Sequence, residues 1–232
     1  MIACSGSVIV TVIRFKSTVI AMRYNQMTDE QGRWTLDSET EASNPGNVKV
    51  QRTTWFIAYP FWPIVWATVL FLFVILATLF HWSFWIPAAI LLFINWFYWQ
   101  QVTGHFAYGD ANPGLVVSTN PVLIAVATDL TKGHGEFPVV KVFQKRIRLI
   151  NGLPVEIGSR VATVAVYTAT SDDNDPYWED FDPRPVSCAT SNQAEIQAVM
   201  NTFSKRDWEN LEASIRGLPK PLLPGLHHLR AR

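Results

Sequence analysis

The chain has 232 residues, of which 49% are hydrophobic and 16% charged, and its 19 basic and 19 acidic side chains cancel at neutral pH. This balance gives no reason to expect a nucleic-acid partner. Cys4 and Cys188 lie far apart and have no histidine or cysteine neighbours at metal-ligand spacing, so we expect no disulfide framework, no zinc site and no cofactor.

Residues 1–54 form an N-terminal segment that we expect to be largely disordered. Residues 28–48 are mostly polar, with glycine, proline and asparagine near their end. Such a segment buries too little apolar surface to offset the entropy that it loses on ordering. We therefore predict a disordered lead-in to the apolar part of the chain.

The apolar residues near the N-terminus do not fit a signal peptide. Positive charge precedes the apolar core of such a peptide, whereas Arg14 and Lys16 fall inside it here. One interpretation is an amphipathic strand or an interfacial segment. The other is that translation starts at Met22 or Met27 rather than at Met1, so that the preceding residues are upstream sequence.

Residues 55–101 are predicted to form a transmembrane helical hairpin. Residues 55–99 contain no Asp, Glu, Lys or Arg. A helix needs about 20 apolar residues to cross a hydrocarbon core of about 30 Å, so this stretch is long enough for two crossings. Prolines at its start and a polar break near Ser83 place the helices at about 61–80 and 84–99.

Aromatic residues gather at both ends of this stretch and at its tip, as expected where helices cross the headgroup region. Lys49 and Arg52 precede the first helix, and the tip has no basic residue. Because basic residues near membrane-spanning helices favour the cytoplasmic side, both termini are predicted to be cytoplasmic.

Asn95 is a polar residue within the second predicted helix. Its amide could bond to Thr68 or Thr78 of the first helix, or to a second copy of the chain. We favour water at the nearby membrane interface, because such intramembrane bonds contribute only about 0.6 to 2 kcal/mol. The absence of charge within the spans disfavours an ion or proton path.

Residues 104–190 read as a β-rich domain. Short apolar or alternating runs occur at about 122–128, 139–149 and 160–167, with turn signals between them, including the Asn151-Gly152 pair. Four to six short strands with tight turns predict a small antiparallel sheet or barrel.

Residues 191–232 are predicted to form two helices, at about 192–203 and 205–216, and a proline-rich tail packed on the β domain. Ser204 with Asp207 matches a capping box, and Gly217 ends the second helix. The predicted fold class is therefore a membrane-anchored α+β protein, with a two-helix transmembrane hairpin, a small antiparallel β-sheet or barrel and two C-terminal helices.

An acidic loop at residues 171–185 is the most conspicuous cluster of possible chemistry. Its carboxylates are oxygen ligands of the kind that calcium prefers, but the loop lacks the glycine of a calcium-binding loop and Pro176 interrupts it. We favour a solvated loop that aromatic residues anchor to the core, and we predict no metal site.

A glycine-rich turn at residues 132–137 lacks the spacing of a phosphate-binding loop, so an ordinary turn is favoured. No established pattern of catalytic residues is present, and we predict no catalytic residue. The residues that we retain as a possible functional loop come from this turn, from the strand end just before it and from the acidic loop: Asp129, His134, Trp178, Asp180 and Asp182.

Five stretches in the C-terminal half resemble a family of bacterial proteins defined only as a domain of unknown function. They read PVLIAVATDL, GSRVATVAVY, YWEDFDPRPVSCAT, DWENLEASIRGLP and PGL. In that family a similar DFDP segment follows a valine-rich strand, and a DW-L-LP-type helix follows in turn. The organisation is also similar to nodulation-efficiency-protein-D-like membrane proteins, which carry an OB-type barrel. The resemblance implies no activity and transfers no catalytic residue.

Three hypotheses for function remain. The first is a membrane-anchored, non-enzymatic interaction or scaffold protein. The second is an accessory subunit of a larger membrane complex. The third is a hydrolase or ligand-binding enzyme that uses Asp129, His134 and the acidic loop. The expected partners are the lipid bilayer and either another protein or further copies of this chain.

Overall fold

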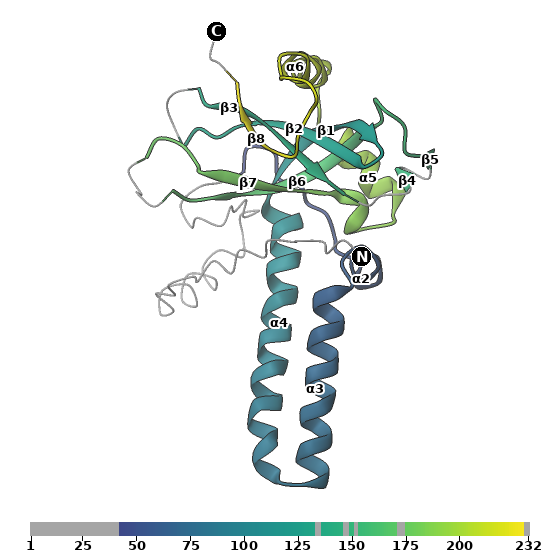
Figure 1. Ribbon diagram of the computed structural model, residues 1–232, viewed down its shortest axis with the longest axis vertical. Coiled ribbons are helices and arrows are strands. Elements are labelled where there is room, and N and C mark those ends of the chain that lie inside the picture. Colours follow the sequence, from purple (N-terminus) through teal and green to yellow (C-terminus); the bar gives the residue numbers. More distant parts are fainter. Residues whose placement is uncertain (1–41, 133–135, 146–148, 151–152, 171–174, 230–232) are drawn as a thin grey trace. The chain divides into compact units, whose positions relative to one another are not determined.

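The structure is a computed structural model, and it describes residues 42–132, 136–145, 149–150, 153–170 and 175–229 (Figure 1). Its helices are α2 (Arg52–Ala58), α3 (Phe61–Leu79), η2 (Trp82–Phe84), α4 (Trp85–Tyr108), η3 (Val186–Cys188), α5 (Gln193–Met200) and α6 (Lys205–Arg216). Its strands are β1 (Asp110–Thr119), β2 (Val122–Asp129), β3 (Pro138–Gln144), β4 (Leu149–Ile150), β5 (Leu153–Pro154), β6 (Arg160–Thr168), β7 (Asp180–Pro185) and β8 (Gly225–His228).

The predicted hairpin is confirmed: α3 and α4 lie side by side and are joined through η2 (Figure 1). Both helices are long and apolar enough to cross a membrane, and little of either apolar stretch is buried within the protein. Phe71 is 66% exposed, Leu79 74% and Phe93 64%. A surface of this kind is unfavourable in water but suits lipid, so the chain is treated as a membrane protein.

The second helix is longer than predicted, ending at Tyr108 rather than near residue 99. The charge-free stretch ends at Trp99, but the helix continues because Val102, His105 and Phe106 are buried against the β-rich part of the chain. The last turns of α4 are thus part of the domain core, and the first strand starts at Asp110.

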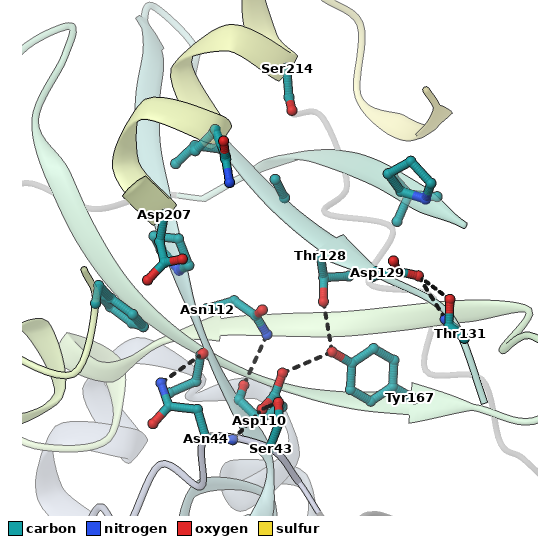
Figure 2. Close-up of a pocket in the computed structure, with 18 of the residues that line it drawn as sticks. Ser43, Asn44, Asp110, Asn112, Thr128, Asp129, Thr131, Tyr167, Asp207 and Ser214 are labelled. Carbon is teal, nitrogen blue, oxygen red and sulfur yellow. Dashed lines mark hydrogen bonds between the residues drawn. The ribbon is translucent and has the colours of Figure 1, made fainter. Parts of the chain in front are cut away.

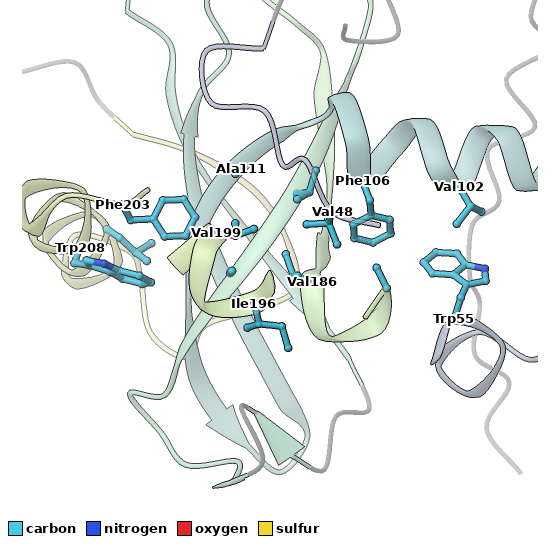
Figure 3. Close-up of a cluster of buried hydrophobic side chains, with 14 residues drawn as sticks. Val48, Trp55, Val102, Phe106, Ala111, Val186, Ile196, Val199, Phe203 and Trp208 are labelled. Carbon is cyan, nitrogen blue, oxygen red and sulfur yellow. The ribbon is translucent and has the colours of Figure 1, made fainter. Parts of the chain in front are cut away.

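The predicted disorder of the N-terminal segment is wrong for its described part; residues 1–41 lie outside the described residues. Val48 is 2% exposed and packs with Phe106 and Trp55, as Figure 3 shows. The backbone N–H groups of Gly46 and Val48 donate to the carbonyls of Gly109 and Phe106 at 2.9 and 3.1 Å. The burial of Val48 and these backbone hydrogen bonds hold the described residues before α2 in place, although their composition predicts disorder.

The β-rich part is an open, antiparallel, six-stranded half-barrel with the order β7-β6-β1-β2-β3-β8. The alternative of a closed barrel is wrong, because β7 and β8 form the two edges of this sheet and do not pair with each other. Strands β4 and β5 form a separate two-stranded ribbon.

The end of the predicted acidic loop forms strand β7, which lies at a sheet edge. An edge tolerates Pro183 and Pro185, since a proline cannot donate a ladder hydrogen bond. Alternation buries Phe181 completely while Asp182 faces outward. After β7 the chain continues as the short helix η3.

The two C-terminal helices are confirmed. The Ser204–Asp207 capping box is present, and the Asn192 side chain accepts from the Ala194 N–H at 3.0 Å. Ile196 and Val199 of α5, and Trp208 and Leu211 of α6, are buried in the cluster of Figure 3. The proline-rich tail contributes β8, which pairs with β3.

Gly109 joins α4 to β1 where two backbones approach closely. A Cβ atom at this position would collide with the His105 carbonyl and lie 2.7 Å from the Ala165 carbonyl oxygen. We expect Gly109→Ala to lower the free energy of unfolding by about 1 to 3 kcal/mol. Urea unfolding of the full-length protein in detergent, followed by tryptophan fluorescence, measures this change.

Gly104→Ala is the matched control, because a Cβ there meets only a Tyr108 ring carbon at 4.0 Å. A helical glycine changed to alanine gains up to about 1 kcal/mol when nothing clashes. Equal effects of the two substitutions would contradict a close-packed joint at Gly109.

Candidate functional site

A cavity of about 570 Å³ lies where β1, β2 and β6 meet α6 and residues 42–44 (Figure 2). Its lining includes three carboxylates: Asp110 in β1, Asp129 at the end of β2, and Asp207 in α6. None of the described residues that line it is a lysine or an arginine. The cavity therefore combines a negative lining with the aromatic faces of nearby side chains.

Asp110 forms the floor of this cavity and is 7% exposed. Its Oδ1 accepts from the backbone N–H of Asn44 at 2.9 Å and from the hydroxyl of Ser43 at 3.1 Å. Its Oδ2 accepts from the hydroxyl of Tyr167 at 3.0 Å. Both carboxylate oxygens are thus hydrogen-bonded, as a buried acid requires.

A chain of hydrogen bonds crosses three neighbouring strands at the cavity floor. Because the Tyr167 hydroxyl donates to Asp110, the Thr128 hydroxyl donates to Tyr167, with the two oxygens 2.7 Å apart (Figure 2). The side-chain amide of Asn112 donates to the carbonyl of Asp110 at 3.1 Å. These bonds hold the polar floor in one arrangement.

Burial sets the protonation behaviour of this floor. It raises the pKa of Asp110 above its ordinary value, although the hydrogen bonds from Asn44, Tyr167 and Ser43 act in the opposite direction. Burial, together with the nearby negative charge of Asp110, raises the pKa of Tyr167 far above its ordinary value. Tyr167 is therefore a neutral donor at physiological pH.

The other two carboxylates lie at structural positions. Oδ1 of Asp129 accepts from the backbone N–H groups of Thr131 and Phe137 at 2.9 and 3.0 Å, which closes the turn between β2 and β3. Oδ2 of Asp207 accepts from the backbone N–H and the hydroxyl of Ser204, both at 2.8 Å, in the cap of α6.

The structure does not bring the residues of the predicted functional loop together at one site. Asp129 and Trp178 both line the cavity. Asp180 instead pairs with Lys141 at 2.7 Å, and Asp182 pairs with Arg184 at 2.7 Å, and neither of the two acids lines the cavity. His134 lies outside the described residues.

Sequence reasoning missed Asp110, Thr128 and Tyr167. The signal that could have found them is alternation, since Asp110 and Asn112 occupy alternate positions of one strand and so share a face. The contact of Tyr167 with Asp110 depends on the register Asp110↔Ala165, which no local pattern specifies.

Asn95 is partly buried on α4, and no hydrogen bond joins it to Thr68 or Thr78 among the described residues. The Thr78 hydroxyl donates within its own helix, to the Val74 and Ile75 carbonyls at 3.1 and 3.0 Å. A contact of Asn95 with a second copy of the chain stays a prediction.

Comparison with known proteins assigns the chain to a family. The model of the family described as "Protein of unknown function (DUF3239)" matches residues 99–218, and the chain belongs to that family. This match confirms the resemblance to a domain of unknown function. The comparisons do not confirm the DFDP segment as a motif of that family, nor the similarity to nodulation-efficiency-protein-D-like proteins.

One solved structure is similar, that of a candidate membrane protein from Corynebacterium diphtheriae. The two share 19% sequence identity, and the alignment covers 52% of this chain and 100% of that chain with a TM-score of 0.44. A likeness of this size transfers no residue role. No curated protein matches the chain.

Removing the Tyr167 hydroxyl tests the hydrogen-bonded floor. Tyr167→Phe leaves Oδ2 of Asp110 and the Thr128 hydroxyl without this partner. We expect the free energy of unfolding to fall by about 1 to 3 kcal/mol in urea unfolding of the full-length protein. Tyr177→Phe, at a residue that is 37% exposed, is the control and should change it by less than about 0.5 kcal/mol.

The raised pKa of Asp110 predicts a pH dependence. When the pKa of an acid is higher in the folded state than in the unfolded state, the folded state binds the proton more tightly. The resulting stabilisation is complete below the pKa of the unfolded state, about 3.9, and is lost as pH rises through the pKa of the folded state. The stability of the wild type relative to Asp110→Asn should therefore be greater near pH 4 than near pH 7. Urea unfolding of both proteins at the two pH values measures the difference between their free energies of unfolding. An advantage of the wild type that grows as pH rises would contradict a raised pKa of Asp110.

Proposed function

We propose that this member of the DUF3239 family is a membrane-anchored, non-enzymatic interaction protein. The hairpin anchors the chain, and the cavity above Asp110 receives a hydrogen-bond-donating or positively charged group of a protein partner. The observation that carries the proposal is the hydrogen-bonded chain Thr128–Tyr167–Asp110 at the cavity floor. It fixes an acidic, partly aromatic surface in one geometry.

The bonding of the carboxylates supports binding rather than catalysis. A general base needs an oxygen directed at the proton that it removes. Both oxygens of Asp110 accept bonds from the protein, Asp129 closes a turn and Asp207 caps a helix. The hydrolase hypothesis required Asp129, His134 and the acidic loop to act together, and two acids of that loop, Asp180 and Asp182, pair with Lys141 and Arg184 instead.

The charges beside the hairpin support a cytoplasmic domain. Besides Lys49 and Arg52, the side chains of Lys145 and Arg184 lie against Tyr59 and Trp55, next to the start of α3. Basic residues near membrane-spanning helices favour the cytoplasmic side. The proposal therefore keeps both termini in the cytoplasm. The accessory-subunit hypothesis differs from it only in the identity of the partner.

Photo-crosslinking from α6 tests the cavity as the interaction site. Asn210 lines the cavity, whereas its neighbour Glu209 does not line it and pairs with Lys205 at 3.5 Å. A benzoylphenylalanine at position 210 of the full-length protein in cells should give one reproducible protein adduct, identified by mass spectrometry.

The same group at position 209 is the matched control, since both side chains are exposed on one turn of one helix. The proposal predicts an adduct from 210 that is absent or much weaker from 209, and that is lost when Asp110→Asn is added. Equal labelling from the two positions, or none from either, contradicts it.

A further inference from the structure

A second cavity, of about 400 Å³, lies between α2 and α4, apart from the cavity above Asp110. Its lining comes from one side of the short helix α2 and from one aromatic residue of α4: Arg52, Thr53, Phe56, Ile57 and Trp99. We call this surface the α2 groove. Its volume falls in the range of small-molecule and cofactor sites, about 300 to 1,000 Å³.

The lining surface of the α2 groove is apolar, from Phe56, Ile57 and Trp99 and from the carbon atoms of Arg52 and Thr53. The guanidinium of Arg52 lies over the Trp99 ring beside this surface. Phe56 is 43% exposed and Ile57 80% exposed, although they follow the buried Trp55. Exposed apolar side chains beside a cation suit a ligand that has both an anionic group and a hydrocarbon part.

The position of the groove along the chain identifies the source of such a ligand. Trp99 is the last residue of the charge-free stretch, and Val102, less than one turn later, is already in the domain core. On the other side, α2 ends at Ala58, and the membrane-spanning α3 begins at Phe61. The groove therefore lies at the level where the spans leave the hydrocarbon, which is the headgroup region.

Arg52 differs from the other cations around α2. Arg184 lies over Trp55 at 5.5 Å but is also bonded to Asp182, and Lys145 lies over Tyr59 and donates to the Ala58 carbonyl at 3.5 Å. The guanidinium of Arg52 is 5.5 Å from the Trp99 ring and forms no ion pair with any described residue.

We propose that the α2 groove binds one anionic phospholipid of the surrounding bilayer. The guanidinium of Arg52, which lies over the Trp99 ring, donates to the lipid phosphate, a pairing that arginine makes in a bidentate manner. Phe56 and Ile57 contact the first part of an acyl chain. The proposal is independent of the cavity above Asp110.

Native mass spectrometry of the full-length protein tests this proposal. The protein is released from detergent that contains equal amounts of phosphatidylglycerol and phosphatidylcholine, and the ratio of the bound lipids is measured. The wild type should prefer phosphatidylglycerol, and Arg52→Gln should reduce that preference about fivefold, the effect of one basic residue near an anionic surface. Arg52→Lys keeps the charge and should retain most of the preference.

Lys49→Gln is the matched control, because it removes the same charge from an exposed residue three positions earlier that does not line the groove. Ile57→Ser should weaken the binding of both lipids and leave their ratio unchanged. Equal effects of Lys49→Gln and Arg52→Gln would show diffuse attraction by surface charge and overturn the proposal. A wild type without preference for phosphatidylglycerol would also overturn it.

Discussion

Phe106, in the last turn of α4, is completely buried between the sheet and residues 46–48. Around it, His105 donates from Nε2 to the Val164 carbonyl at 2.9 Å, and Gly46 and Val48 donate to the carbonyls of Gly109 and Phe106. These contacts join a membrane-spanning helix to the sheet without a flexible linker. The rest of the structure depends on this joint, since the helix, the described part of the N-terminal segment and β6 meet there.

The joint also places the candidate site. Asp110 is the first residue of β1 and follows Gly109, the cap of α4, so the floor of the cavity is one residue from the end of a membrane helix. The segment that covers Phe106 continues backward to Ser43 and Asn44, which donate to Asp110. One set of backbone contacts therefore orders the anchor and the acidic floor together.

Three aromatic side chains each contact one basic side chain where the hairpin meets the domain. Trp55, Tyr59 and Trp99 each lie against one cation, namely Arg184, Lys145 and Arg52. Cation–π contacts of this kind let a positive charge remain beside apolar surface at a membrane interface. Arg184 is also bonded to Asp182 and Lys145 to the Ala58 carbonyl, while the side chain of Arg52 is exposed. The short helix α2 thus lies where the hairpin meets the domain.

The sequence by itself determined the hairpin, the antiparallel sheet and the capped C-terminal helices. Each of these follows from local chemistry: a charge-free stretch, alternation with turn residues, and the Ser204–Asp207 cap. The membership in a family without assigned function could also be predicted from the C-terminal half.

Only the tertiary structure decided the extension of α4, the ordering of residues 42–51 and the open edge of the sheet. It also decided the site, because Ser43, Asp110 and Tyr167 are distant in sequence, and the register of β1 with β6 brings two of them together. The physical reason is that a polar side chain does not show in a local pattern whether it will be buried. That outcome depends on which strands pair, and strand pairing is a property of the whole chain.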